Sequence, residues 1–115
     1  MPETIYFMWR EKTVAKIIFD YKTKTVSVEN YTDKMQLRPF GINETPSFDD
    51  FEYFLESRCM PKTRHDLKFI LKKLDLPCWD PWVLIRFNHG LQYEDYGWIR
   101  MEGEEVNYED IKIRN

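Results

Sequence analysis

Eleven residues in the middle of the chain contain most of the side chains that could do chemistry. The stretch 56–66, ESRCMPKTRHD, places a thiol and an imidazole among several cations around a proline. A thiolate can attack an electrophile when nearby positive charge lowers the pKa of the thiol and a base activates it. Arg58, Lys62 and Arg64 are expected to lower the pKa of Cys59, and His65 is a base close to it in sequence. Because no third residue that would orient the imidazole can be named, a thiol-dependent enzyme is kept only as an alternative.

The same stretch contributes to a possible metal site. The ligands would be Cys59, His65, Cys78 and His89, with the spacing C-x5-H-x12-C-x10-H. Structural zinc usually takes its ligands from close pairs of residues, and this spacing contains none. We therefore expect no metal and no cofactor, with a metal-dependent enzyme as a further alternative. Two cysteines in a chain of 115 residues are expected to be reduced thiols rather than a disulfide.

The cations themselves are the third possibility. Arg58, Lys62 and Arg64 flank a short connector between two predicted helices, and the start of the second helix adds free N–H groups. Together they suit a carboxylate or phosphate, or an acidic surface of a partner. In the structural interpretation, Arg58 instead satisfies carbonyls at the end of the first helix and pairs with Asp66 or another nearby acid. Both interpretations stay open, and the three cations are candidate residues for binding an anion or a partner.

Acidic residues gather at the other end of the chain. Residues 91–115 contain three Lys or Arg and seven Asp or Glu, within a net charge of −3 for the whole chain. Such a run usually keeps a protein in solution, but it can also imitate the phosphates of a nucleic acid. The possible acidic contact face comprises Glu94, Asp95, Glu102, Glu104 and Glu105. Without a basic excess overall, general binding of nucleic acid is not expected.

The elements that must position these residues begin with strands. Both ends of the chain have segments rich in β-branched and aromatic side chains or with alternating polarity. These segments are residues 4–10, 14–20, 25–29, 96–101 and 110–113. The first three predict an antiparallel meander, and the others predict C-terminal strands. Residues 107–110 are also compatible with a helical turn.

Helices are predicted in the middle. Ser47 and Asp50 have the spacing of a capping box and start a helix that runs to about Arg58. A second helix is expected to start at Thr63, with Asp66 at the capping-box offset. Its apolar stripe consists of Leu67, Ile70, Leu71 and Leu74.

A short third helix is predicted from Asp80-Pro81, an N-cap followed by proline, through Asn88. Its apolar residues nearly encircle it, so we expect it to be mostly buried. The expected fold is α+β. An antiparallel sheet, made of the N-terminal meander and C-terminal strands, packs against a helical hairpin plus the short third helix.

Composition sets the limits of this fold. Hydrophobic residues make up 43% and aromatic residues 17% of the sequence, which is typical of a folded chain. The length predicts one compact domain over residues 1–115, folding alone or as a homodimer. No apolar run is long enough to cross a bilayer and no secretory leader is visible, so we expect a cytoplasmic protein without membrane contact.

Several short motifs carry a resemblance. The segments FLESRCMPKTR at 54–64, LDL at 74–76, DP at 80–81, HGL at 89–91 and DYGWIR at 95–100 follow one another along the chain. In this order they resemble small proteins of HipA-like kinase loci on mobile elements of Gram-positive bacteria. The chain also looks loosely like the N-terminal subdomain of HipA toxins, a small sheet with helices and no kinase chemistry.

The resemblance implies a partner of a kinase rather than a kinase. The sequence has no glycine-rich phosphate loop and no H-R-D catalytic loop, and Asp95-Tyr96-Gly97 lacks the context of a metal-binding D-F-G. We expect a non-enzymatic protein-interaction module, accessory to a HipA-like kinase, a toxin–antitoxin pair or a related defence system. The main alternative is an acidic inhibitor of a defence nuclease that mimics nucleic acid, as anti-CRISPR proteins of phages do.

Overall fold

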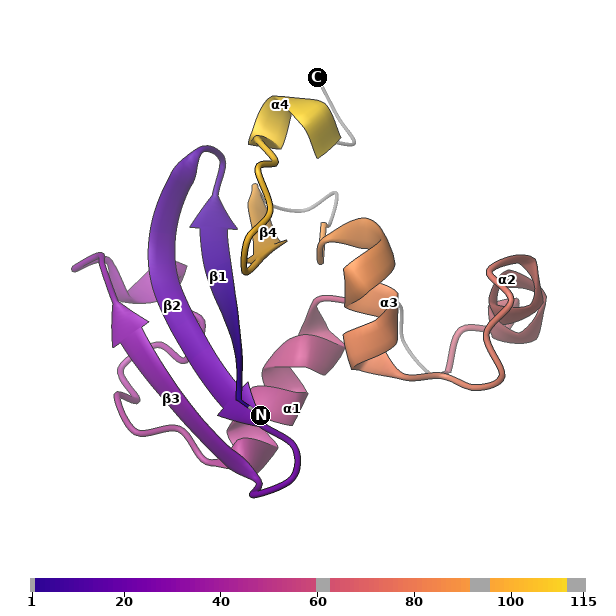
Figure 1. The fold of residues 1–115 in the computed structure, drawn as a ribbon, viewed down its shortest axis with the longest axis horizontal. Coiled ribbons are helices and arrows are strands. Elements are labelled where there is room, and N and C mark those ends of the chain that lie inside the picture. Colours follow the sequence, from indigo (N-terminus) through magenta and orange to yellow (C-terminus); the bar gives the residue numbers. More distant parts are fainter. Residues whose placement is uncertain (1, 60–62, 92–95, 112–115) are drawn as a thin grey trace.

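The structure, a computed structural model, describes residues 2–59, 63–91 and 96–111 (Figure 1). It is an α+β fold, as predicted from the sequence. The sheet has four antiparallel strands in the order β3-β2-β1-β4. The N-terminal meander and the C-terminal strand are both confirmed. The strands are β1 (Glu3–Trp9), β2 (Lys12–Asp20), β3 (Thr25–Asn30) and β4 (Gly97–Met101).

Helical segments follow the meander and follow β4. They are the 3-10 helix η1 (Met35–Leu37) and the α-helices α1 (Phe48–Ser57), α2 (Leu67–Lys73), α3 (Pro81–Asn88) and α4 (Tyr108–Ile111). The strand predicted at 110–113 is wrong for residues 110 and 111, which belong to α4, and its last two residues lie outside the described ranges. The alternative of a helical turn near residue 107 is confirmed. None of the described helices has the length and apolar character needed to cross a lipid bilayer.

The main core lies between one face of the sheet and the helices α1 and α3 (Figure 1). Aromatic contacts join the layers: the ring of Phe19 on β2 stacks on Phe51 of α1 at 4.5 Å, and Phe7 on β1 meets Phe54 edge-on at 5.4 Å. The alternation of the strands places these rings on the same side of the sheet. Burial of such large rings is a principal source of stability here.

A smaller apolar cluster covers part of the other face. Trp98 on β4 is fully buried against Met8 of β1, and Tyr108 of α4 closes over both. The indole N–H of Trp98 donates to the carbonyl of Arg10 at 2.6 Å, which satisfies its polar edge. Trp98 is therefore a residue of this second core.

The start of α1 agrees with the prediction made from its capping residues. The hydroxyl of Ser47 accepts from the backbone N–H of Asp50 at 3.1 Å, and the carboxylate of Asp50 accepts from the backbone N–H of Ser47 at 2.9 Å. This reciprocal pair is the capping box that the sequence predicted.

The second helix differs from its prediction. It begins at Leu67 rather than Thr63, and the carboxylate of Asp66 at its N-cap accepts no capping hydrogen bond from the backbone. The reason is that the carboxylate of Asp66 binds Arg64 instead. At its other end, Asp75 has a positive φ of 60°, and the backbone N–H of Leu76 donates to the carbonyl of Leu71 at 2.8 Å. This left-handed turn ends α2.

The third helix begins as predicted, with the carboxylate of Asp80 accepting from the backbone N–H of Trp82 at 3.1 Å. Leu84 and Ile85 are buried, but Phe87 is 56% exposed, so the expectation of a mostly buried helix is wrong on one side. The helix beside α1 is α3, whereas α2 lies farther from the sheet and reaches the core through Leu71 (Figure 1).

Candidate functional site

Arg58 has a structural position in the fold. Its side chain is 6% exposed, and its guanidinium donates from Nε to the carbonyl of Gly90 at 3.0 Å and from Nη2 to the carbonyl of Gly97 at 2.7 Å. It also lies over the ring of Phe7 at 5.4 Å. One side chain thus ties the end of α1 to the chain after α3 and to the start of β4. The sequence predicted a structural clamp on carbonyls of α1 and on Asp66 or another nearby acid. Asp66 instead pairs with Arg64, and the clamp reaches the carbonyls of Gly90 and Gly97.

Two glycines make this approach possible. A Cβ at Gly97 would lie 2.9 Å from Cζ of Phe7 and 3.0 Å from Nη2 of Arg58, and a Cβ at Gly90 would lie 3.3 Å from Cβ of Arg58. Gly90 also has a positive φ of 66°, which favours glycine. The DYGWIR and HGL motifs therefore contain the residues that receive Arg58.

Arg64 points elsewhere and is exposed. Its Nε lies 2.6 Å from Oδ1 of Asp66, in an ion pair whose two side chains are 48% and 38% exposed. The hydrogen bond from Arg64 holds the pKa of Asp66 below its ordinary value. Lys62, the third predicted cation, lies outside the described residues. The structure thus separates Arg58 from Arg64 instead of joining them in one anion site.

Cys59 does not have the environment of a nucleophile. Its side chain is 9% exposed, and its thiol donates to the carbonyl of Glu56 at 3.6 Å. Burial, followed by the charges of Glu56 and Asp80, raises the pKa of Cys59 to about 11. The expectation that neighbouring cations lower this pKa is wrong, because Arg58 directs its guanidinium into the core. Cys78, by contrast, is an exposed free thiol.

The acidic face is only partly free to contact anything. Glu104 turns inward: its Oε1 accepts from the backbone N–H of Met101 at 2.7 Å, and its Oε2 lies 3.2 Å from Nε2 of His89. Glu102 accepts from the hydroxyl of Tyr6 at 3.0 Å, and Glu105 is exposed. Glu94 and Asp95 lie outside the described residues.

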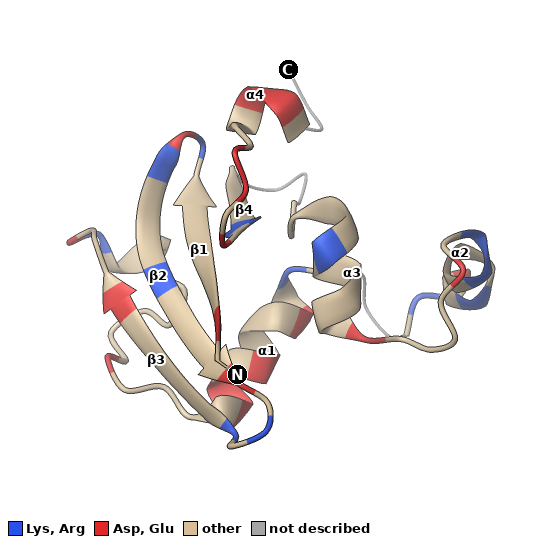
Figure 2. Cartoon of the chain, in the orientation of Figure 1, with Lys and Arg blue, Asp and Glu red and all other residues tan. Residues whose placement is uncertain are grey.

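A basic surface on α2 was missed by the sequence analysis. It consists of Lys68, Lys72 and Lys73, all exposed, and is called the α2 lysine face below. Figure 2 shows it as the blue part of the helix farthest from the sheet. In the described part of the chain the side chains of these three lysines take part in no ion pair or hydrogen bond. The sequence contains a signal for it, since Lys68 and Lys72 are four residues apart and share one helix face.

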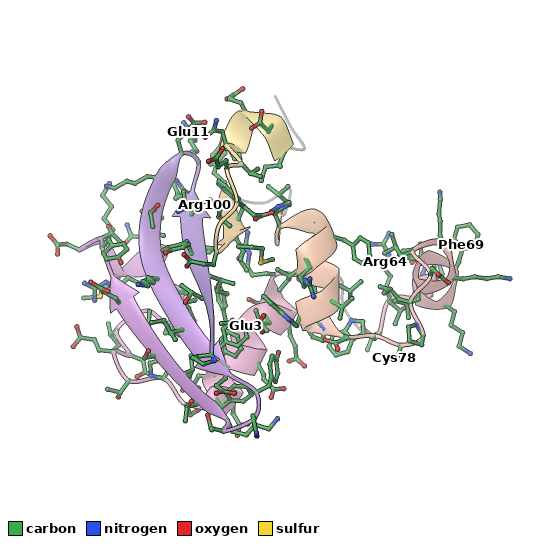
Figure 3. All side chains as sticks on the ribbon, in the orientation of Figure 1. Glu3, Glu11, Arg64, Phe69, Cys78 and Arg100 are labelled. Atoms are coloured by element: carbon green, nitrogen blue, oxygen red, sulfur yellow. The ribbon has the colours of Figure 1, made fainter. Side chains whose placement is uncertain are left out.

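Arg64 extends this surface toward the connector, and Phe69 and Cys78 lie on the same projecting part of the molecule (Figure 3). Phe69 is 68% exposed. The projecting part therefore presents positive charge together with one uncovered aromatic ring.

No group of three or more His, Cys, Asp or Glu side chains within residues 2–59, 63–91 and 96–111 could hold a metal ion. Comparison of the chain with protein families, with curated proteins and with solved structures gave no match.

Proposed function

We propose that this protein is a non-enzymatic interaction module that binds an acidic surface of another protein through the α2 lysine face. The observation that carries the proposal is the position of Lys68, Lys72 and Lys73. They are exposed on a helix that projects from the sheet, and no carboxylate of the described chain pairs with them. Unneutralised cations on a projecting element attract an oppositely charged partner and orient it during encounter.

The partner class comes from the sequence resemblance. The motifs shared with small proteins of HipA-like kinase loci favour a HipA-like kinase, or the toxin–antitoxin or defence system around it, as the binding partner. In this proposal the protein is an accessory or regulatory subunit that acts beside the kinase in the cytoplasm. The motif residues Arg58 and Gly97 maintain the fold, and the neighbouring α2 makes the contact.

The acidic alternative, mimicry of nucleic acid toward a defence nuclease, has less support. Mimicry requires carboxylates that are free to imitate phosphates. Glu104 is bound to Met101 and His89, and Glu102 is bound to Tyr6. A thiol-dependent reaction likewise has little support, because the raised pKa of Cys59 keeps its sulfur protonated at neutral pH.

The test is calorimetric titration of the purified protein with a purified HipA-like kinase. One variant reverses Lys68, Lys72 and Lys73 to Glu. A matched control reverses three exposed lysines on the sheet side of the molecule, namely Lys12, Lys22 and Lys34. Both variants change the net charge equally, so a general charge effect weakens both alike, whereas a specific contact distinguishes them.

We expect the α2 variant to lose about 100-fold or more in affinity, since three charge-assisted contacts are reversed, and the control to stay close to wild type. Circular dichroism establishes that both variants are folded. The proposal is overturned if wild type does not bind the kinase, or if the two variants weaken binding to the same extent.

A further inference from the structure

Two hollows lie near the link between α2 and α3, one beside each helix. One, of about 390 Å3, lies against the end of α2, and the other, of about 370 Å3, lies against α3. They share Leu76 in the link between the helices. The first is lined by Lys68, Leu71, Lys72, Asp75, Leu76 and Pro77, and the second by Leu76, Val83, Arg86 and Phe87. We call the two together the α2–α3 groove.

The floor of the groove is apolar and partly uncovered. Leu76 and Val83 are half-buried, and Phe87 exposes 56% of its surface although it follows the buried Leu84 and Ile85. A bound apolar side chain would remove the exposed surface of this ring from water, which is favourable by about 25 cal/mol per Å2 of apolar surface buried. The groove thus suits bulky apolar side chains.

Its rim is positive. Lys68 and Lys72 border the hollow on α2, and Arg86 borders the hollow on α3. Against these three cations the described lining contains one carboxylate, Asp75. Within the described ranges the side chain of Arg86, like those of the lysines, enters no hydrogen bond or ion pair. An occupant with carboxylates beside its apolar side chains complements both the floor and the rim.

We infer that the α2–α3 groove binds an acidic amphipathic segment of the partner, with two bulky apolar side chains in the hollows and Asp or Glu residues against the rim. This inference rests on the proposed function and specifies which part of the partner is recognised. Amphipathic segments commonly dock in apolar grooves by such spaced anchors. The acidic C-terminal segment of a second copy does not fit, because its apolar residues Val106, Tyr108 and Ile111 are packed in the smaller core.

The probe is a displayed library of random peptides, selected on the immobilised full-length protein. We expect the selected peptides to be enriched in Asp and Glu together with Leu, Phe or Trp. The strongest of them is then synthesised in three forms: unchanged, with its apolar residues replaced by Ser, and with its acidic residues replaced by Lys. Fluorescence anisotropy at moderate salt measures the three affinities.

Two exposed phenylalanines supply matched variants of the protein. Phe87 lines the groove, whereas Phe69, which is more exposed, lies outside its lining. We expect Phe87→Ser to weaken binding of the unchanged peptide about tenfold, a loss of about 1.4 kcal/mol in binding free energy. Phe69→Ser should leave this affinity near wild type. Because both side chains are already in water, neither variant is expected to unfold the protein.

The outcomes distinguish binding in the apolar groove from binding to the α2 lysine face alone and from binding to a membrane surface. If the Ser form binds as tightly as the unchanged peptide and the Lys form does not bind, the apolar groove is wrong while the lysine face stands. If selection yields no acidic amphipathic peptide, or if Phe69→Ser weakens binding as much as Phe87→Ser, the inference is overturned. Binding of phosphatidylserine vesicles without binding of the selected peptide also overturns it, in favour of a membrane surface.

Discussion

Replacing Arg58 by Ala removes the donor that two buried carbonyls share. The guanidinium donates to Gly90 at 3.0 Å and to Gly97 at 2.7 Å, and both glycines are buried. A buried acceptor that loses its partner costs about 1–3 kcal/mol. Counting these two bonds alone at about 1.5 kcal/mol each gives a loss of about 3 kcal/mol in the free energy of unfolding. For a domain of this size, that lowers the Tm by about 12 °C.

Urea unfolding monitored by tryptophan fluorescence measures this loss, and Arg64→Ala is the control. Arg64 also belongs to a hydrogen-bonded ion pair, but the pair is exposed, so its loss is expected to cost less than about 1 kcal/mol. Arg58→Lys keeps the charge and part of the hydrogen bonding, and should fall between wild type and Arg58→Ala. If Arg58→Ala unfolds at the same urea concentration as Arg64→Ala, the structural role assigned to Arg58 is refuted.

Three further predictions concern α1, the thiols and α2. Ser47→Ala should lower the free energy of unfolding by about 1 kcal/mol through loss of the cap. Hydrogen bonds from Ser47 lower the pKa of Asp50, so the stabilisation by the Asp50 carboxylate is complete above about pH 4 and is lost as the pH falls further. In acid titrations, Asp50→Asn should reduce this loss of stability. Cys78 should react with a thiol reagent in the folded protein at pH 8, while Cys59 reacts only on unfolding; equal reaction rates of the two thiols would contradict the raised pKa of Cys59. The free energy of unfolding should fall as the pH rises from 9 toward 11, because the Cys59 thiol ionises at lower pH in the unfolded chain than in the folded protein. Asp75→Gly should raise the free energy of unfolding by up to about 1 kcal/mol, because glycine adopts the left-handed conformation at this position without strain. Asp75→Ala should give no such gain.

The sequence was informative wherever a feature depends on near neighbours. The capping box of Ser47 and Asp50, the start of α3 at Asp80 and the alternation of the strands are read within a few residues, and the structure confirms them. The partners of Arg58 were not accessible in this way. Gly90 and Gly97 lie 32 and 39 residues away in sequence, and only the packing of α3 and β4 brings them close.

The site residues that differ from their predicted roles do so for the same reason. The start of α2 moved to Leu67 because Asp66 has two possible partners, and local spacing cannot decide that Arg64 takes its carboxylate. The cations near Cys59 were judged by their distance in sequence, but Arg58 points its charge into the core and the thiol is buried. Exposure of Phe87 depends on which helix lies beside α3, which no local pattern specifies.

The central claim, that the partner contacts the projecting α2 region, is tested most directly by photo-crosslinking from Cys78. This exposed thiol follows Pro77, which lines the α2–α3 groove, and Cys59 is buried, so a benzophenone maleimide attaches selectively. The control carries Cys78→Ser together with Ser27→Cys, at an exposed position on β3. The account predicts that the HipA-like kinase crosslinks to the probe at position 78 and not to the probe at position 27. Crosslinking from position 27 with none from position 78 would contradict it.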